Sequence, residues 1–149
     1  MASKAQQTGM QGVYLVAAQL SGKGFIVSPT SRSAKGADLL VTDMNCLHAF
    51  SVQVKSNAAN TSYWLVGEHA RALTSPSHVY VLVNLLKDRT VNEYFVVPSE
   101  ELVRRVKESR HEKSTWWYVD RKDVADWQNK WEVFQPSVAL HPPSSTLEG

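Results

Sequence analysis

The chain has 149 residues, of which 43% are hydrophobic and 20% are charged, and its formal net charge is +2. This composition is typical of a soluble globular protein, and a domain of this length buries roughly two-thirds of the surface that its unfolded chain exposes. No apolar run approaches the roughly 20 residues needed to span a bilayer, and the polar start "MASKAQQTG" differs from a usual signal peptide. The single cysteine, Cys46, cannot form an internal disulfide, which favours a reducing, cytoplasmic compartment.

Basic residues are unevenly distributed along the sequence. Residues 1–37 contain no Asp or Glu and hold four basic residues: Lys4, Lys23, Arg32 and Lys35. From residue 57 onward there are 11 basic and 12 acidic side chains. A positive excess in the segment that leads to Asp38 suits a polyanionic partner such as nucleic acid, although four basic residues make a small footprint.

The first half of the chain predicts a helix followed by an antiparallel hairpin. Apolar residues at helical spacing indicate the helix, and Gly22 and Gly24 are typical of a helix end. A short apolar strand, a loop of small and basic residues, and two alternating strands come next. These segments are residues 9–24 (helix), 25–29 (strand), 30–36 (loop), 37–43 and 49–57 (hairpin), and 61–66, which extend the sheet or lead into a loop.

The second half predicts two further strands with helices behind them. Residues 78–86 form a near-continuous apolar run, as expected for a strand covered on both faces. The remaining segments are residues 93–97 (strand), 99–110 (helix with Ser99 as N-cap), 121–131 (short helix), 131–134 (strand or turn) and 136–149 (disordered tail). The order predicts an α/β fold with a mixed sheet, in one domain over residues 1–135.

Three polar side chains interrupt the apolar pattern of the hairpin. Gln53 and Lys55 alternate with valines and therefore share one face of their strand, while Asp38 lies on the strand before. Paired positions in an antiparallel hairpin have a constant sum. A sum of 91 or 93 places Asp38 opposite Gln53 or Lys55, whereas a sum of 92 turns it away; the sequence leaves this register open.

These residue types suit metal-assisted cleavage of a phosphodiester. Mg²⁺ prefers oxygen ligands, which Asp38, the amide of Gln53 and the intervening backbone carbonyl can supply. The ion polarises a phosphate and lowers the pKa of a bound water, and Lys55 can hold or deprotonate that water or neutralise charge on the phosphate. The alternative is an exposed salt bridge between Asp38 and Lys55, contributing less than about 1 kcal/mol.

The order of these segments resembles a known superfamily. "GVYLVAAQLSGKG", "ADLLVTD" and "FSVQVKSN" resemble the core of the PD-(D/E)xK, or restriction-endonuclease-like, nucleases, over roughly the first 60 residues. The resemblance implies a mixed β-sheet flanked by helices, a metal and catalytic site formed by Asp38, Gln53 and Lys55, and Mg²⁺ or Mn²⁺ as cofactor. The superfamily's first helix usually presents a glutamate where this chain has Val13, and Gln11 or Gln19 is at most a neutral substitute.

Two functions from different classes follow from this resemblance. The first is a divergent endonuclease that hydrolyses DNA with Mg²⁺, works as a homodimer and contacts phosphates through Arg32 and Lys35. The second is a catalytically inactive module that retains the fold and binds nucleic acid or protein. Val13 favours the inactive module, whereas the retained Asp38, Gln53 and Lys55 favour the enzyme; an α/β domain with no nucleic-acid role is a third possibility.

Other chemistry-bearing residues form weaker patterns. Cys46 and His48 lack a second ligand pair, so a buried thiol beside a surface histidine is the favoured interpretation. The stray acid Glu68 follows a strand-like segment, and nothing in the sequence places it near the sheet. The basic side chains on the expected helix are interpreted as a solvated face rather than as contacts to a nucleic-acid backbone; they are Arg104, Arg105, Lys107 and Arg110. The "WWY" run at residues 116–118 could stack on bases, and the favoured interpretation is a mixture of core and rim residues.

Overall fold

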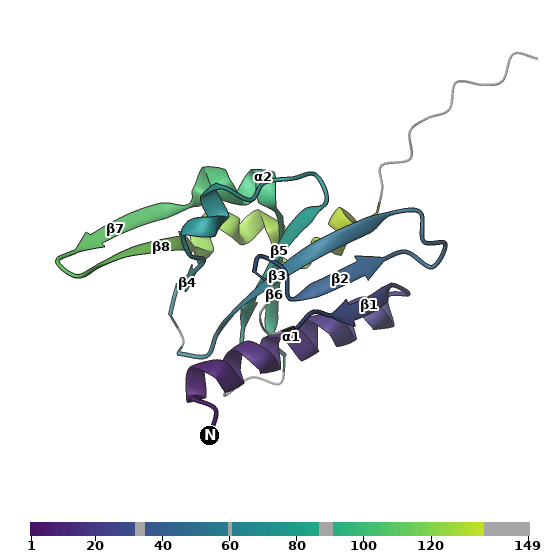
Figure 1. Ribbon diagram of the computed structural model, residues 1–149, viewed down its shortest axis with the longest axis horizontal. Helices are drawn as coiled ribbons and strands as arrows, with labels where there is room; N and C mark the ends of the chain where they lie inside the picture. The colour runs from purple at the N-terminus through teal and green to yellow at the C-terminus, as the bar shows by residue number, and fades with distance from the viewer. Residues whose placement is uncertain (32–34, 60, 87–90, 136–149) are drawn as a thin grey trace, which may run out of the picture.

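The computed structural model describes residues 1–31, 35–59, 61–86 and 91–135. The tail at 136–149, which the sequence predicts to be disordered, lies outside the described residues. The main sheet has five strands in the order β1-β2-β3-β5-β6 (Figure 1). Its strands are β1 (Ile26–Pro29), β2 (Leu39–Thr42), β3 (Ala49–Asn57), β5 (His78–Asn84) and β6 (Glu93–Pro98).

The main sheet is mixed, as the sequence predicts. Strands β1, β2 and β3 pair antiparallel, β3 and β5 pair parallel, and β5 and β6 pair antiparallel. Every residue of β5 is buried, because α1 covers one face of the sheet and a second, smaller sheet covers the other. The predicted α/β class with a mixed sheet and flanking helices is confirmed.

Helix α1 (Lys4–Gly22) lies across one face of the main sheet. It begins five residues earlier than the apolar spacing predicts, because Ser3 and Gln6 form a capping box. It ends as expected, and Gly24 there has a φ of 90°. Its apolar stripe packs against β3 and β5 in a first core cluster that contains Val13, Val16, Leu20, Val52, Val54, Val79 and Val81.

The approach of α1 to the sheet is closest at Gly12. A Cβ atom at this position would lie 1.7 Å from Ser56 Oγ, whereas one at Gly9 would meet no atom within 4 Å. The hydroxyl of Ser56 is buried beneath the helix without a hydrogen-bond partner. A glycine is therefore what lets α1 sit directly on β3.

A second sheet covers the other face of the main sheet. Its strands, in the order β4-β8-β7, are β4 (Tyr63–Leu65), β8 (Ser114–Asp120) and β7 (Lys107–His111). Trp64, Val66 and Val119 face inward and join Tyr80 and Leu82 of β5 in a second core cluster, and the Trp64 indole donates to the Val83 carbonyl at 3.0 Å. The β7–β8 hairpin projects away from the body of the molecule (Figure 1).

The helix expected over residues 99–110 is wrong for most of its length. Helix α2 spans only Ser99–Leu102, a 3₁₀ turn (η2) covers Val103–Arg105, and the chain then enters β7. Pairing with β8 overrides the local helical propensity of this segment. Ser99 is not an N-cap, because its hydroxyl donates to the Ser75 carbonyl.

The remaining segments are short. Residues 61–66 contain β4, which joins the second sheet instead of extending the main one. Three 3₁₀ turns complete the described residues: η1 (Glu68–Arg71), η3 (Arg121–Trp127) and η4 (Trp131–Phe134). No helix within the described part of the chain combines the length and the apolar character needed to cross a membrane.

Candidate active site

The three polar residues of the hairpin lie on one face of the main sheet, opposite α1. Leu39 pairs with Val52, so paired positions sum to 91, and this register continued by one residue places Asp38 opposite Gln53. Gln53 and Lys55 lie beside Tyr80 and Leu82 of β5, on the face of the second core cluster. The observed sum of 91 is one of the two values, 91 and 93, that place Asp38 on the same face as Gln53 and Lys55.

The Asp38 backbone is fixed from both sides. Its N–H donates to the Val52 carbonyl of β3 at 2.7 Å, and its carbonyl accepts from the Thr30 N–H, just after β1, at 2.9 Å. The Thr30 hydroxyl also donates to the Ala37 carbonyl at 2.7 Å. Thr30 is a positioning residue that no pattern in the sequence indicates, because its role depends on the pairing of β1 with β2.

The Asp38 carboxylate is equally well ordered. Its Oδ2 atom accepts from the Gln53 side-chain amide at 2.7 Å and from the Val54 N–H at 2.8 Å. An ionised carboxylate can only accept hydrogen bonds, so these two donors fix its orientation. In the described structure neither Asp38 Oδ1 nor Gln53 Oε1 receives a hydrogen bond, and both belong to half-buried residues.

Lys55 is a half-buried cation beside this carboxylate. Burial lowers the pKa of its ammonium, and the negative charge of Asp38 opposes that effect. Among the described residues no ion pair or hydrogen bond joins Lys55 to Asp38, so the alternative of a simple salt bridge is wrong. The Asp38 carboxylate therefore acts electrostatically on the Lys55 ammonium without pairing with it, and the ammonium remains available to a ligand.

The oxygen donors of this cluster are of the type that a magnesium ion prefers, but together they carry a single negative charge. Asp38 Oδ1 and Gln53 Oε1 are hard oxygen donors without partners in the described structure, which is what a largely hydrated Mg²⁺ uses. Only one of them is charged, and no group of three His, Cys, Asp or Glu residues gathers within the described part of the chain. Substrate phosphates would have to supply the remaining negative charge.

Helix α1 does not contribute to this cluster. Val13 is 8% exposed and packs in the first core cluster with Val54, on the opposite face of β3 from Gln53. No hydrogen bond within the described residues links Gln11 or Gln19 to the cluster. The missing first-helix glutamate is therefore not replaced by a neighbouring glutamine.

Glu68 lies on the side of the sheet that holds the cluster. It opens η1, whose buried Ala70 belongs to the second core cluster together with Tyr80. The chain after η1 lies against the loop before Asp38. This follows from the position of Leu73, with which a side chain at Gly36 would collide. Glu68 is exposed and makes no hydrogen bond or ion pair within the described structure.

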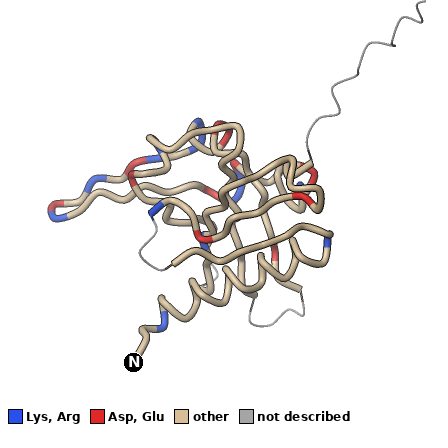
Figure 2. The backbone as a smooth tube through the Cα atoms, turned by 45° about the vertical axis from the view of Figure 1, so that its right-hand side comes forward, with Lys and Arg blue, Asp and Glu red and all other residues tan. Residues whose placement is uncertain are grey.

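The predicted phosphate contacts are only partly placed. Arg32 lies outside the described residues, and Lys35 is exposed in the turn that leads to Asp38. The other two early lysines do not extend this footprint, because they lie at opposite ends of α1: Lys4 begins the helix and Lys23 caps it. In Figure 2 few charges mark α1 and the first strands, while both signs alternate along the β7–β8 hairpin.

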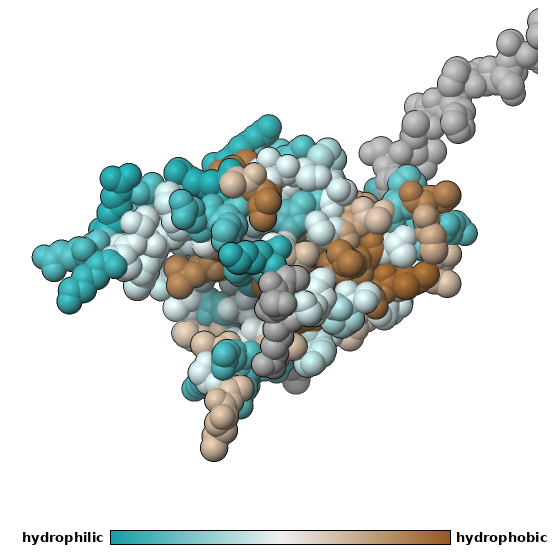
Figure 3. All heavy atoms as spheres, viewed as in Figure 1, coloured by the Kyte–Doolittle hydropathy of each residue, from teal (hydrophilic) through white to brown (hydrophobic). Residues whose placement is uncertain are grey.

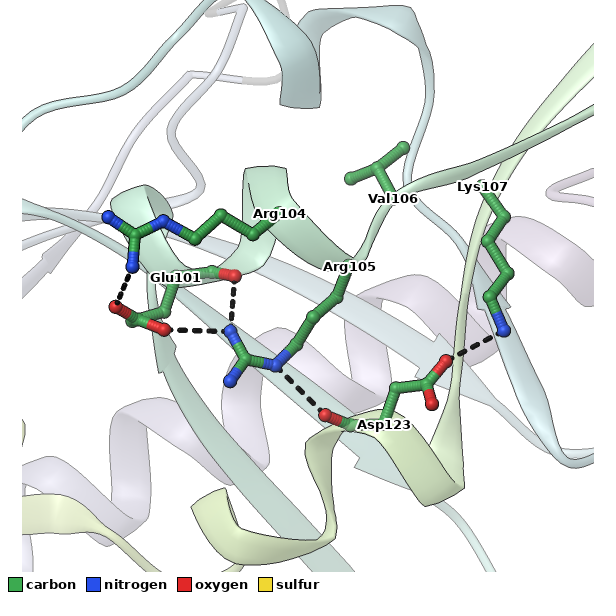
Figure 4. Close-up of a pocket in the computed structure, with 6 residues that line it drawn as sticks. All are labelled: Glu101, Arg104, Arg105, Val106, Lys107 and Asp123. Carbon is green, nitrogen blue, oxygen red and sulfur yellow. Dashed lines mark hydrogen bonds and ion pairs between the residues drawn. The ribbon is translucent and has the colours of Figure 1, made fainter.

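The basic residues after α2 form a neutral cluster. Arg104 and Arg105 both pair with Glu101, at 3.0 and 2.8 Å (Figure 4). Lys107 lies 2.6 Å from Asp120 and 2.8 Å from Asp123. The three cations of this cluster line a cavity of about 550 Å³ together with Glu101 and Asp123, and each of them is already paired with an acid.

The turn between β2 and β3 shows no sign of a metal site. Asp43 organises it by accepting the N–H groups of Asn45, Leu47 and His48. Cys46 has a φ of 56° and an exposed thiol, so the expectation of a buried thiol is wrong. Its exposure follows from its place at the tip of a tight turn.

A histidine lies on the same face as the candidate site. Ser51 Oγ and His78 Nδ1 are 2.7 Å apart, two residues before Gln53. The other ring nitrogen of His78 is buried without a hydrogen-bond partner. Burial lowers the pKa of His78 below its ordinary value of 6.5, although its contact with Ser51 opposes this.

We expect His78 to make the native state sensitive to acid. Below pH 6.5 the unfolded chain binds a proton that native His78 resists, so the free energy of unfolding falls, by at most about 1.4 kcal/mol per pH unit. His78→Gln should flatten this decline. Urea denaturation of both proteins at pH 7.5 and pH 5.5 measures it, and equal declines would contradict the assignment.

The fold defined above is that of the restriction-endonuclease-like nucleases, as the sequence resemblance implies. No family model matches the chain, and no curated protein matches its sequence. Among solved structures, Hjc, a Holliday junction resolvase from Archaeoglobus fulgidus, an archaeal hyperthermophile, is similar with a TM-score of 0.51 and 12% identity, covering 83% of this chain and 95% of that chain.

The second similar structure is the bacterial homing endonuclease I-Ssp6803I. It has a TM-score of 0.56 and 14% identity, and the match covers 91% of this chain and 94% of that chain. Both similar proteins are nucleases by name. At these identities the likeness establishes the fold of this chain.

Proposed function

We propose that the protein is a metal-dependent nuclease that hydrolyses phosphodiester bonds of DNA. The single observation that carries this proposal is the arrangement of Asp38 and Lys55. An ordered carboxylate with one free oxygen lies beside a half-buried ammonium that makes no ion pair. A structural role would pair these two charges, whereas a substrate phosphate and a metal ion would use both.

The roles of the three residues follow from their contacts. Bound Mg²⁺ or Mn²⁺ would supply polarisation of the scissile phosphate and a water of lowered pKa. Asp38 and Gln53 would hold the ion through their free oxygens, and the Val54 N–H keeps the carboxylate in place. Lys55 would neutralise charge on the phosphate oxygens or, because its pKa is lowered, accept the proton of the attacking water.

A cleavage assay tests this function. Wild-type protein with Mg²⁺ should cut a labelled duplex or a branched DNA, and Asp38→Asn should lose at least about 100-fold in rate. Asp126→Asn is the matched control, since Asp126 is exposed and its side chain makes no hydrogen bond or ion pair within the described residues. Equal rates for wild type and Asp38→Asn would assign any cleavage to a contaminant or to another site.

A catalytically inactive nucleic-acid-binding module is the second candidate. It is favoured by the charge of the site, since Asp38 is its one carboxylate and the Gln53 amide nitrogen faces it. DNA binding that persists without metal and without any cleavage, in wild type and Asp38→Asn alike, would support this alternative.

We also propose that the protein acts as a homodimer in the cytoplasm. The face of β1–β3 that holds Asp38 continues into an apolar surface, with Leu40 53% exposed and Ile26 45% exposed (Figure 3). These residues line a cavity of about 380 Å³ that contains no charged side chain. Such a surface suits an apolar partner, and the exposed Cys46 thiol suits a reducing compartment.

Sedimentation should therefore show a dimer that dissociates on substitution. Leu40→Lys places a charge in the apolar surface, and we expect it to produce a monomer at micromolar concentration. Leu65→Lys, on the exposed face of the second sheet, is the matched control because Leu65 is equally exposed at 50%. A monomeric wild type would contradict the dimer.

A further inference from the structure

The outer face of the second sheet carries a stripe of aromatic rings. Side chains alternate along a strand, and the pairing register places Tyr63, Leu65, Trp116, Tyr118 and His111 on the same face. Their neighbours Trp64, Val66 and Val119 point the other way, into the second core cluster. Core packing accounts for one face of this sheet, whereas on the other face Trp116 is exposed and Tyr63 and Tyr118 are half-buried.

The rings of this face are ordered in two pairs. Tyr63 and Tyr118 meet edge to face with centroids 5.9 Å apart, and His111 and Trp116 lie 4.9 Å apart. The Ser109 hydroxyl and His111 Nε2 are 3.2 Å apart, which holds the imidazole on this face. Trp116 is nevertheless 44% exposed. Rings fixed in this way present flat surfaces to a ligand at little cost in side-chain entropy.

One unpaired cation lies near the rings, at the tip of the hairpin. Arg110 is ion-paired with Glu108, and Glu112 precedes Lys113 in the turn. Within the described structure Lys113 makes no ion pair or hydrogen bond, so its charge is available. At the base of the stripe Lys107 is neutralised by Asp120 and Asp123. The turn that carries Lys113, between β7 and β8, is the projecting end in Figure 1.

The stripe is rigidly connected to the candidate active site. Strand β4 follows β3, which carries Gln53 and Lys55, after a short linker. The Asn57 side chain, at the end of β3, donates to the carbonyls of Thr61 and Tyr63 at 2.9 and 3.0 Å. These contacts fix the start of β4, and with it Tyr63, relative to the end of β3.

We propose that this outer face, defined by Tyr63, Trp116, Tyr118 and His111, binds the unpaired bases of a single strand by stacking. The inference rests on the proposed function and specifies its substrate: DNA that carries unpaired bases. Aromatic stacking tolerates any sequence because every base has a flat face. Stacked duplex bases are not accessible to such rings, so the surface discriminates by strand form.

Fluorescence anisotropy with labelled oligonucleotides tests this surface. We expect wild type to bind a single strand more tightly than the matching duplex, and Trp116→Ala to weaken single-strand binding roughly tenfold to a hundredfold. Trp116→Phe should recover part of the loss, because a phenyl ring still stacks. Thr115→Ala, exposed on the same strand with its side chain on the other face, is the control and should stay within about twofold of wild type.

The outcomes separate this inference from the proposed function. Equal single-strand affinity in wild type, Trp116→Ala and Tyr118→Ala would overturn the stacking surface, while Asp38-dependent metal binding and duplex cleavage would keep the nuclease proposal. Loss of Asp38-dependent cleavage together with intact, Trp116-dependent binding would leave the surface and overturn the nuclease. Thermal unfolding of each variant verifies that a loss of binding is not a loss of fold.

Discussion

Replacing Lys55 with methionine should abolish cleavage and at the same time make the protein more stable. The ammonium is half-buried, burial lowers its pKa, and no described residue pairs with it. Methionine keeps the length of the side chain and removes the charge. We expect a rate loss of at least about 100-fold and a gain in the free energy of unfolding of about 1 kcal/mol.

The pH dependence of stability gives a second signature of the same group. Between its lowered native pKa and its ordinary value of 10.5, Lys55 has lost its proton in the native state but keeps it in the unfolded chain. The unfolded state then binds more protons, so wild-type stability gains a contribution as the pH rises through this window. That contribution should be missing in Lys55→Met.

A matched lysine provides the control for this experiment. Lys122 is exposed and makes no ion pair within the described structure, so Lys122→Met should change neither the cleavage rate nor the stability appreciably. If Lys55→Met were less stable than wild type, Lys55 would be a structural residue. If it kept full activity, the catalytic role would be wrong.

The second large effect is expected at Gly12, where α1 crosses β3. A methyl group there would lie 1.7 Å from the buried Ser56 hydroxyl and 3.0 Å from Ser56 Cβ. Rotation of the hydroxyl relieves only the first contact, so α1 and β3 remain overpacked at this point. We expect Gly12→Ala to lower the free energy of unfolding by about 3 kcal/mol, the upper part of the range for overpacked cores. Chemical denaturation measures this difference.

Gly9→Ala is the natural comparison because it makes the same substitution in the same helix. No atom lies within 4 Å of the added methyl, so only helix propensity changes, and we expect a gain of about 0.5–1 kcal/mol. Opposite signs at the two positions would establish the close crossing. A mild effect of Gly12→Ala would mean that α1 sits farther from β3 than described here.

The hairpin was predictable from sequence because its physics is local. Alternation alone places Gln53 and Lys55 on one face, and both strands appear where expected. The register was not predictable, because three sums satisfy the same pattern and only the pairing of Leu39 with Val52 decides among them. The resemblance to the nuclease superfamily pointed to Asp38 as a candidate site residue. The structure shows that the Thr30 N–H holds its backbone carbonyl and the Val54 N–H holds its carboxylate.

The second sheet could not be predicted, and the reason is physical. Residues 103–111 have the composition of a helix, and their strand state depends on pairing with β8. The aromatic stripe could not be predicted for the same reason, because it forms only when these strands pair. Within "WWY" at residues 116–118 the side chains then alternate between core and solvent, so Trp117 packs inward while Trp116 stays exposed. Tyr63, far away in sequence, completes the outer face only after β4 pairs with β8.

The most direct test of the proposed nuclease is calorimetric titration with Mg²⁺ and Mn²⁺, with and without a short DNA duplex. The account predicts weak metal binding by the protein alone, because one carboxylate serves the ion, and tighter binding when phosphates complete its shell. Both signals should disappear in Asp38→Asn and persist in Asp126→Asn. An absence of metal binding in wild type under both conditions would contradict the metal-dependent nuclease.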